Sequence, residues 1–221
     1  MNQCLRCFFV VIILVSCSFS LTSQHLALYQ NGSSRQEGFS NINLGYNLLR
    51  LSAEGASVTI DKILNFGFDY SINDQIDLKV DYQRGFDTEA NSIIAAPKFS
   101  FNKLGVTPGI GYAFGDSYGE LFTNTSLLYE INIRDNATTS LGANYTAFFN
   151  NFSEGQFGFL ISGQADFDQI VLSSVIYFSP DKENDIQFWM INYGVQVSYV
   201  LNSGQNSSSS KSGTKSSIWD Y

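Results

Sequence analysis

The most regularly spaced charges in this chain are Asp77, Lys79 and Asp81, which alternate with apolar residues between Ile76 and Tyr82. A spacing of two places all three charges on one face of a β-strand, because successive side chains of a strand point to opposite faces. Carboxylates that flank a lysine on a strand face are typical of an ion-pair network. They do not form the acid and base pair of a hydrolase.

Catalytic and metal-binding chemistry has little support elsewhere in the sequence. The only histidine is His25, near the N-terminus, whereas nucleophilic mechanisms commonly need a histidine base. The three cysteines, Cys4, Cys7 and Cys17, all lie in the first 20 residues, so there is no Cys/His set for zinc. We therefore expect a protein that is not an enzyme and that has no cofactor and no metal.

The segment before this strand predicts a hairpin. Ile72 and Ile76 must share a face if both apolar patterns are to match, which favours a three-residue loop at Asn73–Gln75 over a two-residue loop. The polar pairs of the predicted register are Asp69 with Lys79, Gly67 with Asp81 and Ser71 with Asp77. The apolar pairs are Phe68 with Val80 and Phe66 with Tyr82.

The setting decides what this polar face does. On a soluble protein it is a solvated face with an ion pair worth about 0–1 kcal/mol. Inside a narrow barrel the same groups form a network across the lumen. The residues predicted for such a network are Asp69, Asp77, Lys79, Asp81, Glu120, Asn124 and Glu130.

Strand-like segments fill the chain from residue 41 to residue 201, with turn residues between them. No segment after the N-terminus has helical periodicity over 11 or more residues. Many segments are longer than the roughly 5–6 residues of sandwich strands and match the roughly 9–11 of a tilted membrane-spanning strand. The nine predicted segments are Asn41–Ala53, Val58–Ile72, Ile76–Arg84, Leu104–Phe114, Leu121–Ile133, Leu141–Phe149, Phe157–Gln164, Ile170–Phe178 and Gln187–Leu201.

Composition favours the same setting. Of 221 residues, 14% are charged, against roughly 25% in an average soluble domain. Aromatic residues make up 15% of the chain. The net charge of −8 excludes a nucleic-acid partner, since phosphate binding needs clustered Lys and Arg.

The two ends of the chain differ from its middle. Residues 1–20 predict a signal peptide, with Arg6 before the apolar run Phe8–Val15 and small residues at Ser18 and Ser20. A competing interpretation is lipidation at Cys17. Residues 21–40 form a polar lead-in, in which Leu26–Tyr29 could be a short strand. Residues 202–221 are rich in Ser and Asn and predict a flexible tail.

The last long segment carries a short motif. Asn192, Gly194, Val197 and Tyr199 fit the pattern polar, any, Gly, any two, hydrophobic, any, hydrophobic. This pattern resembles the β-signal of bacterial outer-membrane barrels, and the resemblance to small members of that class covers residues 41–201. It implies that these four residues are recognised by the barrel-insertion machinery. Those barrels usually end with the last strand, whereas about 20 residues follow here.

The sequence therefore predicts an all-β fold: a closed antiparallel up-and-down transmembrane β-barrel of eight strands, with ten as the alternative, because bacterial barrels have even strand numbers. We expect a monomer in the outer membrane of a Gram-negative bacterium, in contact with lipid. Its expected role is membrane anchoring, surface interaction through loops, or a narrow pore. The connection Phe86–Ser100 is the best candidate loop for an external partner, whose identity the sequence does not give. The alternative is a soluble exported β-sandwich or lipocalin-like binder with its aromatic face inward.

Overall fold

A computed structural model describes residues 34–53, 56–116, 118–183 and 186–203. The predicted signal peptide, the possible strand Leu26–Tyr29 and residues 204–221 of the predicted tail lie outside this part of the chain. Among the described residues no helix is long and apolar enough to cross a membrane. The strands are β1 (Phe39–Ala53), β2 (Ala56–Asn73), β3 (Ile76–Gly85), β4 (Asn91–Phe101), β5 (Leu104–Phe114), β6 (Gly119–Arg134), β7 (Ala137–Phe148), β8 (Asn151–Phe167), β9 (Ile170–Glu183) and β10 (Ile186–Ser203).

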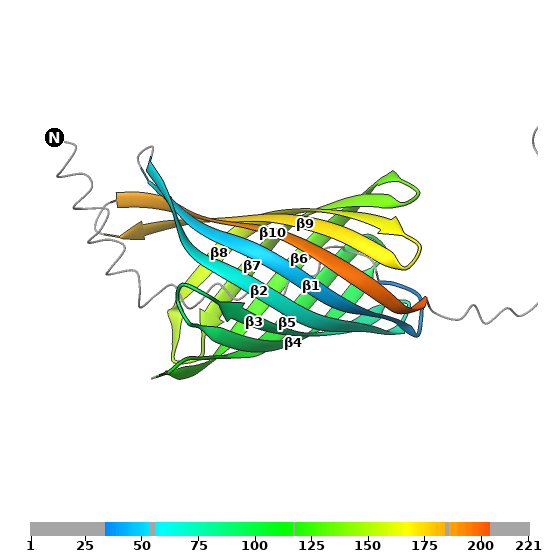
Figure 1. The fold of residues 1–221 in the computed structure, drawn as a ribbon, viewed down its shortest axis with the longest axis horizontal. Helices are drawn as coiled ribbons and strands as arrows, with labels where there is room; N and C mark the ends of the chain where they lie inside the picture. The colour runs from blue at the N-terminus through cyan, green and yellow to red at the C-terminus, as the bar shows by residue number, and fades with distance from the viewer. Residues whose placement is uncertain (1–33, 54–55, 117, 184–185, 204–221) are drawn as a thin grey trace, which may run out of the picture.

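These strands form a closed antiparallel barrel (Figure 1). Each strand pairs with its neighbours in sequence, and β1 pairs with β10 to close the cylinder. The described barrel has ten strands, the larger of the two sizes that the sequence left open. Closure pairs the strand edges with each other, which is the arrangement that a strand protein needs in lipid, where no water can satisfy an open edge.

The wall has a polar inner face and an apolar outer face, because residues along each strand alternate between them. On β10, Asn192 and Ser198 point inward and are 1% and 2% exposed, whereas Val195 and Val197 point outward and are 60% and 50% exposed. The same alternation places large apolar side chains outward on all ten strands. A lipocalin-like binder would require the opposite arrangement, with the aromatic face inward.

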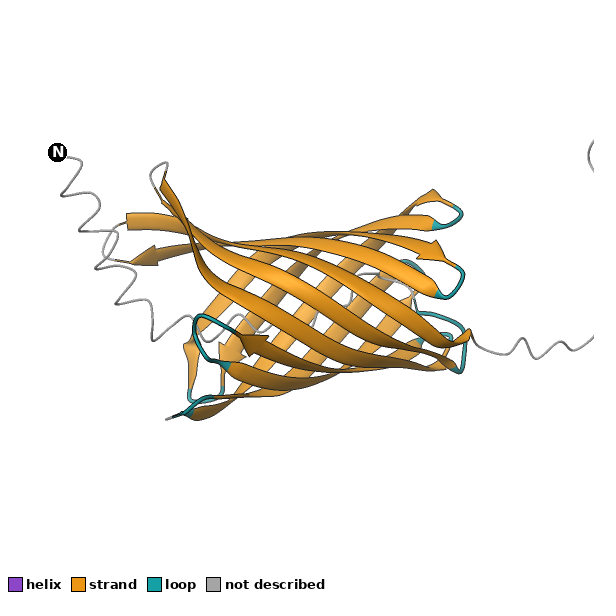
Figure 2. Ribbon diagram, in the orientation of Figure 1, coloured by secondary structure: helices purple, strands orange, loops and turns teal. Residues whose placement is uncertain are grey.

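The two ends of the barrel differ in their connections (Figure 2). We call the end where β1 begins and β10 ends the terminal end, and the other the opposite end. Each turn at the terminal end has two residues between strands, namely 74–75, 102–103, 135–136 and 168–169. The connections at the opposite end are 54–55, 86–90, 115–118, 149–150 and 184–185, so the longest has five residues.

The predicted loop Phe86–Ser100 is wrong, because most of it is the strand β4. Only residues 86–90 connect β3 to β4, while Ile94 and Ala96 point into the lumen and are buried. The sequence hides this strand because apolar residues occupy both of its faces. Pro97 lies within β4, and a proline argues against a strand prediction because it lacks a backbone donor.

The β2–β3 hairpin has the predicted register. Asp69 pairs with Lys79, Gly67 with Asp81 and Ser71 with Asp77. The predicted three-residue loop is replaced by the two-residue turn Asp74–Gln75 together with a register shift between Ser71 and Asn73. A β-bulge adds one residue to one strand, so a short turn with a bulge gives the same pairing as a longer loop.

Apolar side chains fill much of the interior. The largest cluster joins Ile94, Phe122, Leu128, Leu160 and Tyr177, together with smaller residues, from β4 to β9. A second cluster at the opposite end consists of Leu51, Phe188 and Met190, and a third at the terminal end of Phe39, Val171 and Val200. The polar residues therefore occupy only part of the lumen.

Candidate functional site: the polar lumen and its two ends

The centre of the polar region is Lys79 on β3. Its ammonium lies 3.2 Å from Oδ1 of Asp69 and 3.5 Å from Oδ2 of Asp81, and the side chain is 2% exposed. Asp69 comes from the neighbouring strand β2, directly opposite Lys79 in the register. The hairpin therefore brings together three of the residues predicted from sequence, in a setting where charges need partners because they have lost water.

A second buried ion pair joins the next two strands. Lys98 Nζ on β4 lies 2.7 Å from Asp77 Oδ2 on β3, and the two side chains are 1% and 5% exposed. Asp77 was predicted for the lumen, whereas Lys98 was not, because its strand was taken for a loop. Because this strand was not predicted, the sequence did not indicate that Lys98, between Pro97 and Phe99, points inward.

Asn124 belongs to a separate amide and hydroxyl network between β6 and β7. Its Nδ2 donates to Oγ1 of Thr146 at 2.7 Å, and Asn144 Nδ2 donates to Asn124 Oδ1 at 3.0 Å and to Ser126 Oγ at 2.8 Å. All four residues are buried. This network cross-links two strands, as buried polar groups with satisfied hydrogen bonds do.

The two predicted glutamates lie apart from both clusters. Glu120 sits near the opposite end, where its Oε1 accepts a hydrogen bond from Asn150 Nδ2 at 2.8 Å. Glu130 is buried towards the terminal end, and its backbone N–H donates to Lys103 O. The seven predicted residues thus lie in the lumen or at its edge, but they do not form one continuous network.

The residues before β1 cross the terminal mouth of the barrel. We call Ser34–Gly38 the strap. Ser34 Oγ donates to Ser100 Oγ on β4 at 2.9 Å. Arg35 makes a two-pronged contact with Asp166 on β8, at 2.7 and 3.0 Å. In the strand order, β4 and β8 are separated by β5, β6 and β7 on one side. The strap therefore connects different walls of the barrel.

Other contacts hold the strap in place. Gln164 Nε2 donates to Asp166 Oδ1 at 2.8 Å, and the Arg35 guanidinium lies 5.2 Å from the centre of the Phe39 ring. Gly38 has φ of 77°, which glycine adopts at no steric cost, and its N–H donates to Ser71 O. From sequence this segment was predicted only as a polar lead-in. Its contact with β8 could not be predicted, because Arg35 and Asp166 are 131 positions apart.

A cavity of about 40 Å³ lies beneath the strap. Its lining combines the strap with both ion-pair clusters and β10, and includes Arg35, Asp69, Asp77, Lys79, Lys98 and Gln196. Asn41 Oδ1 and Asp77 Oδ1 are buried without a protein donor, and both residues line the cavity. A cavity of this size admits water molecules, which need about 10–15 Å³ each on this measure.

At the opposite end the β3–β4 connection folds onto β2. Asp61 on β2 is buried there and accepts hydrogen bonds from the backbone N–H of Asp87 at 3.0 Å and from Thr88 Oγ1 at 2.5 Å. Tyr118, in the β5–β6 connection, has a pKa raised by burial and by the negative charges of Asp61 and Glu120. Acidic and aromatic groups therefore gather over this mouth.

The four residues of the predicted assembly motif lie on β10, the strand that closes the barrel. Asn192 and Gly194 point inward, and Val197 and Tyr199 point outward. A Cβ at Gly194 would overlap Oδ1 of Asn47 and would lie 2.9 Å from Cγ1 of Val175. Gly194 is therefore required by packing between β1 and β9, whatever its role in assembly.

Within residues 34–203, where described, no three His, Cys, Asp or Glu side chains are grouped so as to hold a metal ion. His25 and the three cysteines lie outside the described residues.

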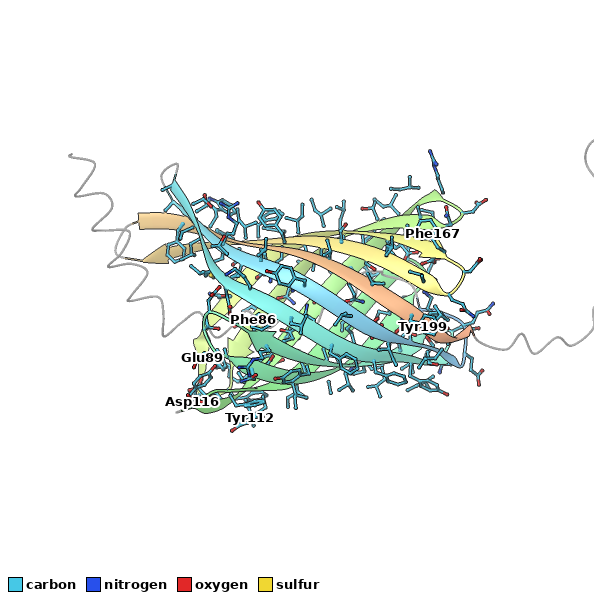
Figure 3. The ribbon with its side chains drawn as sticks, viewed as in Figure 1. Phe86, Glu89, Tyr112, Asp116, Phe167 and Tyr199 are labelled. Carbon is cyan, nitrogen blue, oxygen red and sulfur yellow. The ribbon has the colours of Figure 1, made fainter. Side chains whose placement is uncertain are left out.

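The outer surface completes the description of the barrel (Figure 3). Phe86 and Tyr112 lie at the opposite end with Glu89 and Asp116, and Tyr199 and Phe167 lie at the terminal end. Between the two ends the outward face is covered by large apolar side chains, both aliphatic and aromatic, among them Leu44, Phe66 and Val195. Transmembrane β-barrels present such an apolar band to lipid.

Comparisons with known proteins return barrels of the bacterial outer membrane. No protein-family model matches the chain, and no curated protein matches it. The translocator domain of the autotransporter NalP from Neisseria meningitidis is 11% identical, with 88% of this chain and 95% of that chain covered and a TM-score of 0.46. Ail, the attachment invasion locus protein of Yersinia pestis, is 12% identical, with 74% and 100% covered and a TM-score of 0.32. The KdgM porin in complex with disordered oligogalacturonate is 10% identical, with 72% and 99% covered and a TM-score of 0.44.

The chain thus has the architecture of the outer-membrane β-barrels. The closed wall, the polar interior and the apolar exterior carry this conclusion, because together they satisfy the backbone and the side chains in lipid. TM-scores below 0.5 give no information about role, so the similar proteins define no subfamily.

Proposed function

We propose that this protein is an integral outer-membrane barrel of a Gram-negative bacterium that serves as a sealed, non-enzymatic membrane anchor. The observation that carries the proposal is the burial of the lumen from wall to wall. Lys79, Lys98, Asn144 and Phe122, which face the lumen from different strands, are all between 0% and 2% exposed. An open water-filled channel would leave such side chains accessible to water.

The shortness of the loops supports an anchor over a receptor built from loops. The longest connection at the opposite end has five residues, 86–90, and it folds onto Asp61 over the mouth. Surface interaction through a long loop, one of the roles expected from sequence, has no loop to carry it in the described part of the chain.

The ends of β1 and β10 indicate which parts of the chain the barrel anchors. Phe39 and Ser203 are paired at the terminal end, so the segments that precede β1 and follow β10 join the barrel at that same end. Short turns are typical of the periplasmic face, and the terminal end has only two-residue turns. We infer that the barrel holds both segments in the periplasm, after export by the signal peptide and insertion through the motif on β10.

Three measurements test the anchor. The protein should stay with the membrane fraction and change its gel mobility on boiling in detergent. A C-terminal epitope should resist protease in intact cells and become sensitive once the outer membrane is permeabilised. In planar bilayers the purified protein should give no steady conductance. Recovery in the soluble periplasm would overturn membrane placement, and an epitope cleaved in intact cells would overturn the orientation.

The cavity beneath the strap favours a second candidate, a narrow gated pore. Its lining carries the charges of both ion-pair clusters, and the strap that covers it is held by the part-exposed pair Arg35–Asp166. On this proposal the strap would swing away and admit small ions. Conductance steps in an Arg35→Gln variant but not in the wild type would support the pore. Silent bilayers in both would rule it out.

A further inference from the structure

Three cationic side chains lie on the lipid-facing surface near the opposite end of the barrel. Arg50 is on β1, Lys62 on β2 and Arg84 on β3, three adjacent strands. Each points outward, because both of its neighbours in the chain are buried and point inward. The flanking pairs are Leu49 and Leu51, Asp61 and Ile63, and Gln83 and Gly85. We call these three residues the cationic row.

The strand registers make the row continuous. Arg84 lies opposite Leu64, two residues after Lys62, so Lys62 and Arg84 are diagonal neighbours about 7–8 Å apart across the strand pair. Lys62 lies opposite Leu48, two residues before Arg50, and a bulge between Leu49 and Arg50 places Arg50 opposite Thr59, one residue further along β2 than a regular ladder would. The three cationic groups therefore face one patch of the surrounding membrane.

The protein neutralises this row only in part. Lys62 Nζ lies 3.3 Å from Asp87 Oδ2, in a pair that is half exposed on both sides and therefore weak. Arg84 Nη1 donates to the neutral amide oxygen of Asn91 at 3.1 Å. Arg50 Nε is buried without a hydrogen-bond partner. Glu89, in the β3–β4 connection, is exposed and is the other acidic residue of that connection.

The position of the row along the barrel places it near the level of lipid headgroups. Phe86, which Figure 3 places at the opposite end, donates its backbone N–H to Lys62 O, so Lys62 lies at the same level. Tyr82 is an outward-facing neighbour of the row and donates its hydroxyl to Asn91 Oδ1 at 2.7 Å. Outward Tyr side chains mark the headgroup level of a bilayer. Charged residues on the lipid face are tolerated near that level, where phosphate groups can meet them.

We propose that the cationic row binds the phosphate groups of an anionic membrane lipid whose headgroup carries more than one phosphate. Arg50 and Arg84 would each present a planar fork to phosphate oxygens, and Lys62 would add a point charge between them. The lipid is held at the outer wall of β1, β2 and β3, next to the strand pair that closes the barrel. This inference rests on the membrane placement proposed above, and it adds a binding site to it.

The test uses the full chain, folded in detergent, and native mass spectrometry with added lipid. Bisphosphorylated lipid A is the probe, compared with its monophosphorylated form and with zwitterionic phosphatidylcholine. The variant R50Q/K62Q/R84Q removes the row. The variant K103Q/R134Q removes two cations at the terminal end and is the matched control. We expect the row variant to bind bisphosphorylated lipid at least tenfold more weakly than the wild type, and the control variant to bind it as the wild type does.

Three results would overturn the proposal: unchanged binding by the row variant, equal losses in both variants, or equal affinity for all three lipids. Inorganic phosphate is added as a competitor to distinguish binding of a lipid from binding of a free anion. If inorganic phosphate displaces the lipid when the two are at equal concentration, the row binds soluble phosphate instead. Heat-modifiable mobility is measured first to show that each variant folds. Should the triple variant fail this check, the single variants K62Q and R84Q replace it. Because binding is measured in detergent, its failure is separate from failure of membrane placement in cells.

Discussion

Asp77 and Lys98 face each other across β3 and β4 and form a buried ion pair with Nζ and Oδ2 2.7 Å apart. The pair joins β3, which the sequence predicted as a strand, to β4, which the sequence did not predict as a strand. It also lies beside the Lys79 cluster, so that Lys79 and Lys98 are each paired with a carboxylate on an adjacent strand.

Removing one partner of this ion pair should lower the free energy of unfolding. Lys98→Met leaves Asp77 as a buried charge without its partner, and we expect a loss of about 3–5 kcal/mol in the free energy of unfolding. The double variant D77N/K98M should lose clearly less than the sum of the single changes. Urea unfolding in lipid vesicles measures both values. A loss below about 1 kcal/mol for Lys98→Met would show that the pair is accessible to water.

Gly194 should not tolerate a larger side chain. A Cβ there meets Asn47 and Val175, so Gly194→Ala should lower stability by about 1–3 kcal/mol through overpacking. Gly163→Ala is the control, because its Cβ would lie 3.6 Å from Ser174 Oγ in ordinary contact. Adding Asn47→Ala to Gly194→Ala should restore part of the lost stability, because it removes the contact with Asn47 and leaves the contact with Val175. No loss of stability in Gly194→Ala would contradict the packing requirement.

The strap should control access to the cavity. Ser173 lines the cavity, and a Ser173→Cys variant can be labelled with a water-soluble thiol reagent. Adding Arg35→Gln should accelerate labelling several-fold while changing stability by less than about 1 kcal/mol, because the Arg35–Asp166 pair is part-exposed. Lys62→Gln, which removes a comparable pair at the opposite end, should leave the labelling rate unchanged. Equal rates in all three proteins would mean that the strap does not close the mouth.

A charge on the outer wall should cost most at mid-height. Val195 lies in the middle of β10, and Val195→Arg should destabilise the barrel in vesicles by about 2–4 kcal/mol. Ile133 is also outward-facing but lies at the end of β6, where Ile133→Arg should cost about 0–1 kcal/mol. Similar costs at the two positions would be inconsistent with a lipid band centred on the barrel.

The fold could be predicted from sequence wherever the two faces of a strand differ in polarity. The β2–β3 hairpin shows this: polar Asp69 and apolar Phe68 alternate so regularly that the pairing with Lys79 and Val80 followed directly. The strand β4 breaks the rule, because Ile94 faces the lumen while Ile93 faces outward. A missed strand changed the strand count and hid Lys98 from the predicted site.

The remaining part of the site depends on long-range closure. Arg35 and Asp166 meet only because β1 and β8 stand around one mouth, and no local pattern in the sequence encodes that meeting. Glu120 was assigned to the lumen network from its strand position, but it lies near the opposite end beside Asn150. Alternation gives the face of a residue, whereas the partner of a lumen residue depends on the tilt and closure of the whole barrel.

Spin labels on the two faces of β10 can show directly whether its apolar face lies in lipid. Nitroxide labels placed singly at Val195, Val197 and Ser198 in vesicles report collisions with oxygen, which concentrates in lipid, and with a water-soluble nickel chelate. If the apolar face lies in lipid, labels at Val195 and Val197 collide mainly with oxygen and the label at Ser198 is shielded from lipid. Preferential collision with the nickel chelate at Val195 and Val197 would show that the apolar face does not lie in the membrane, and would contradict the account.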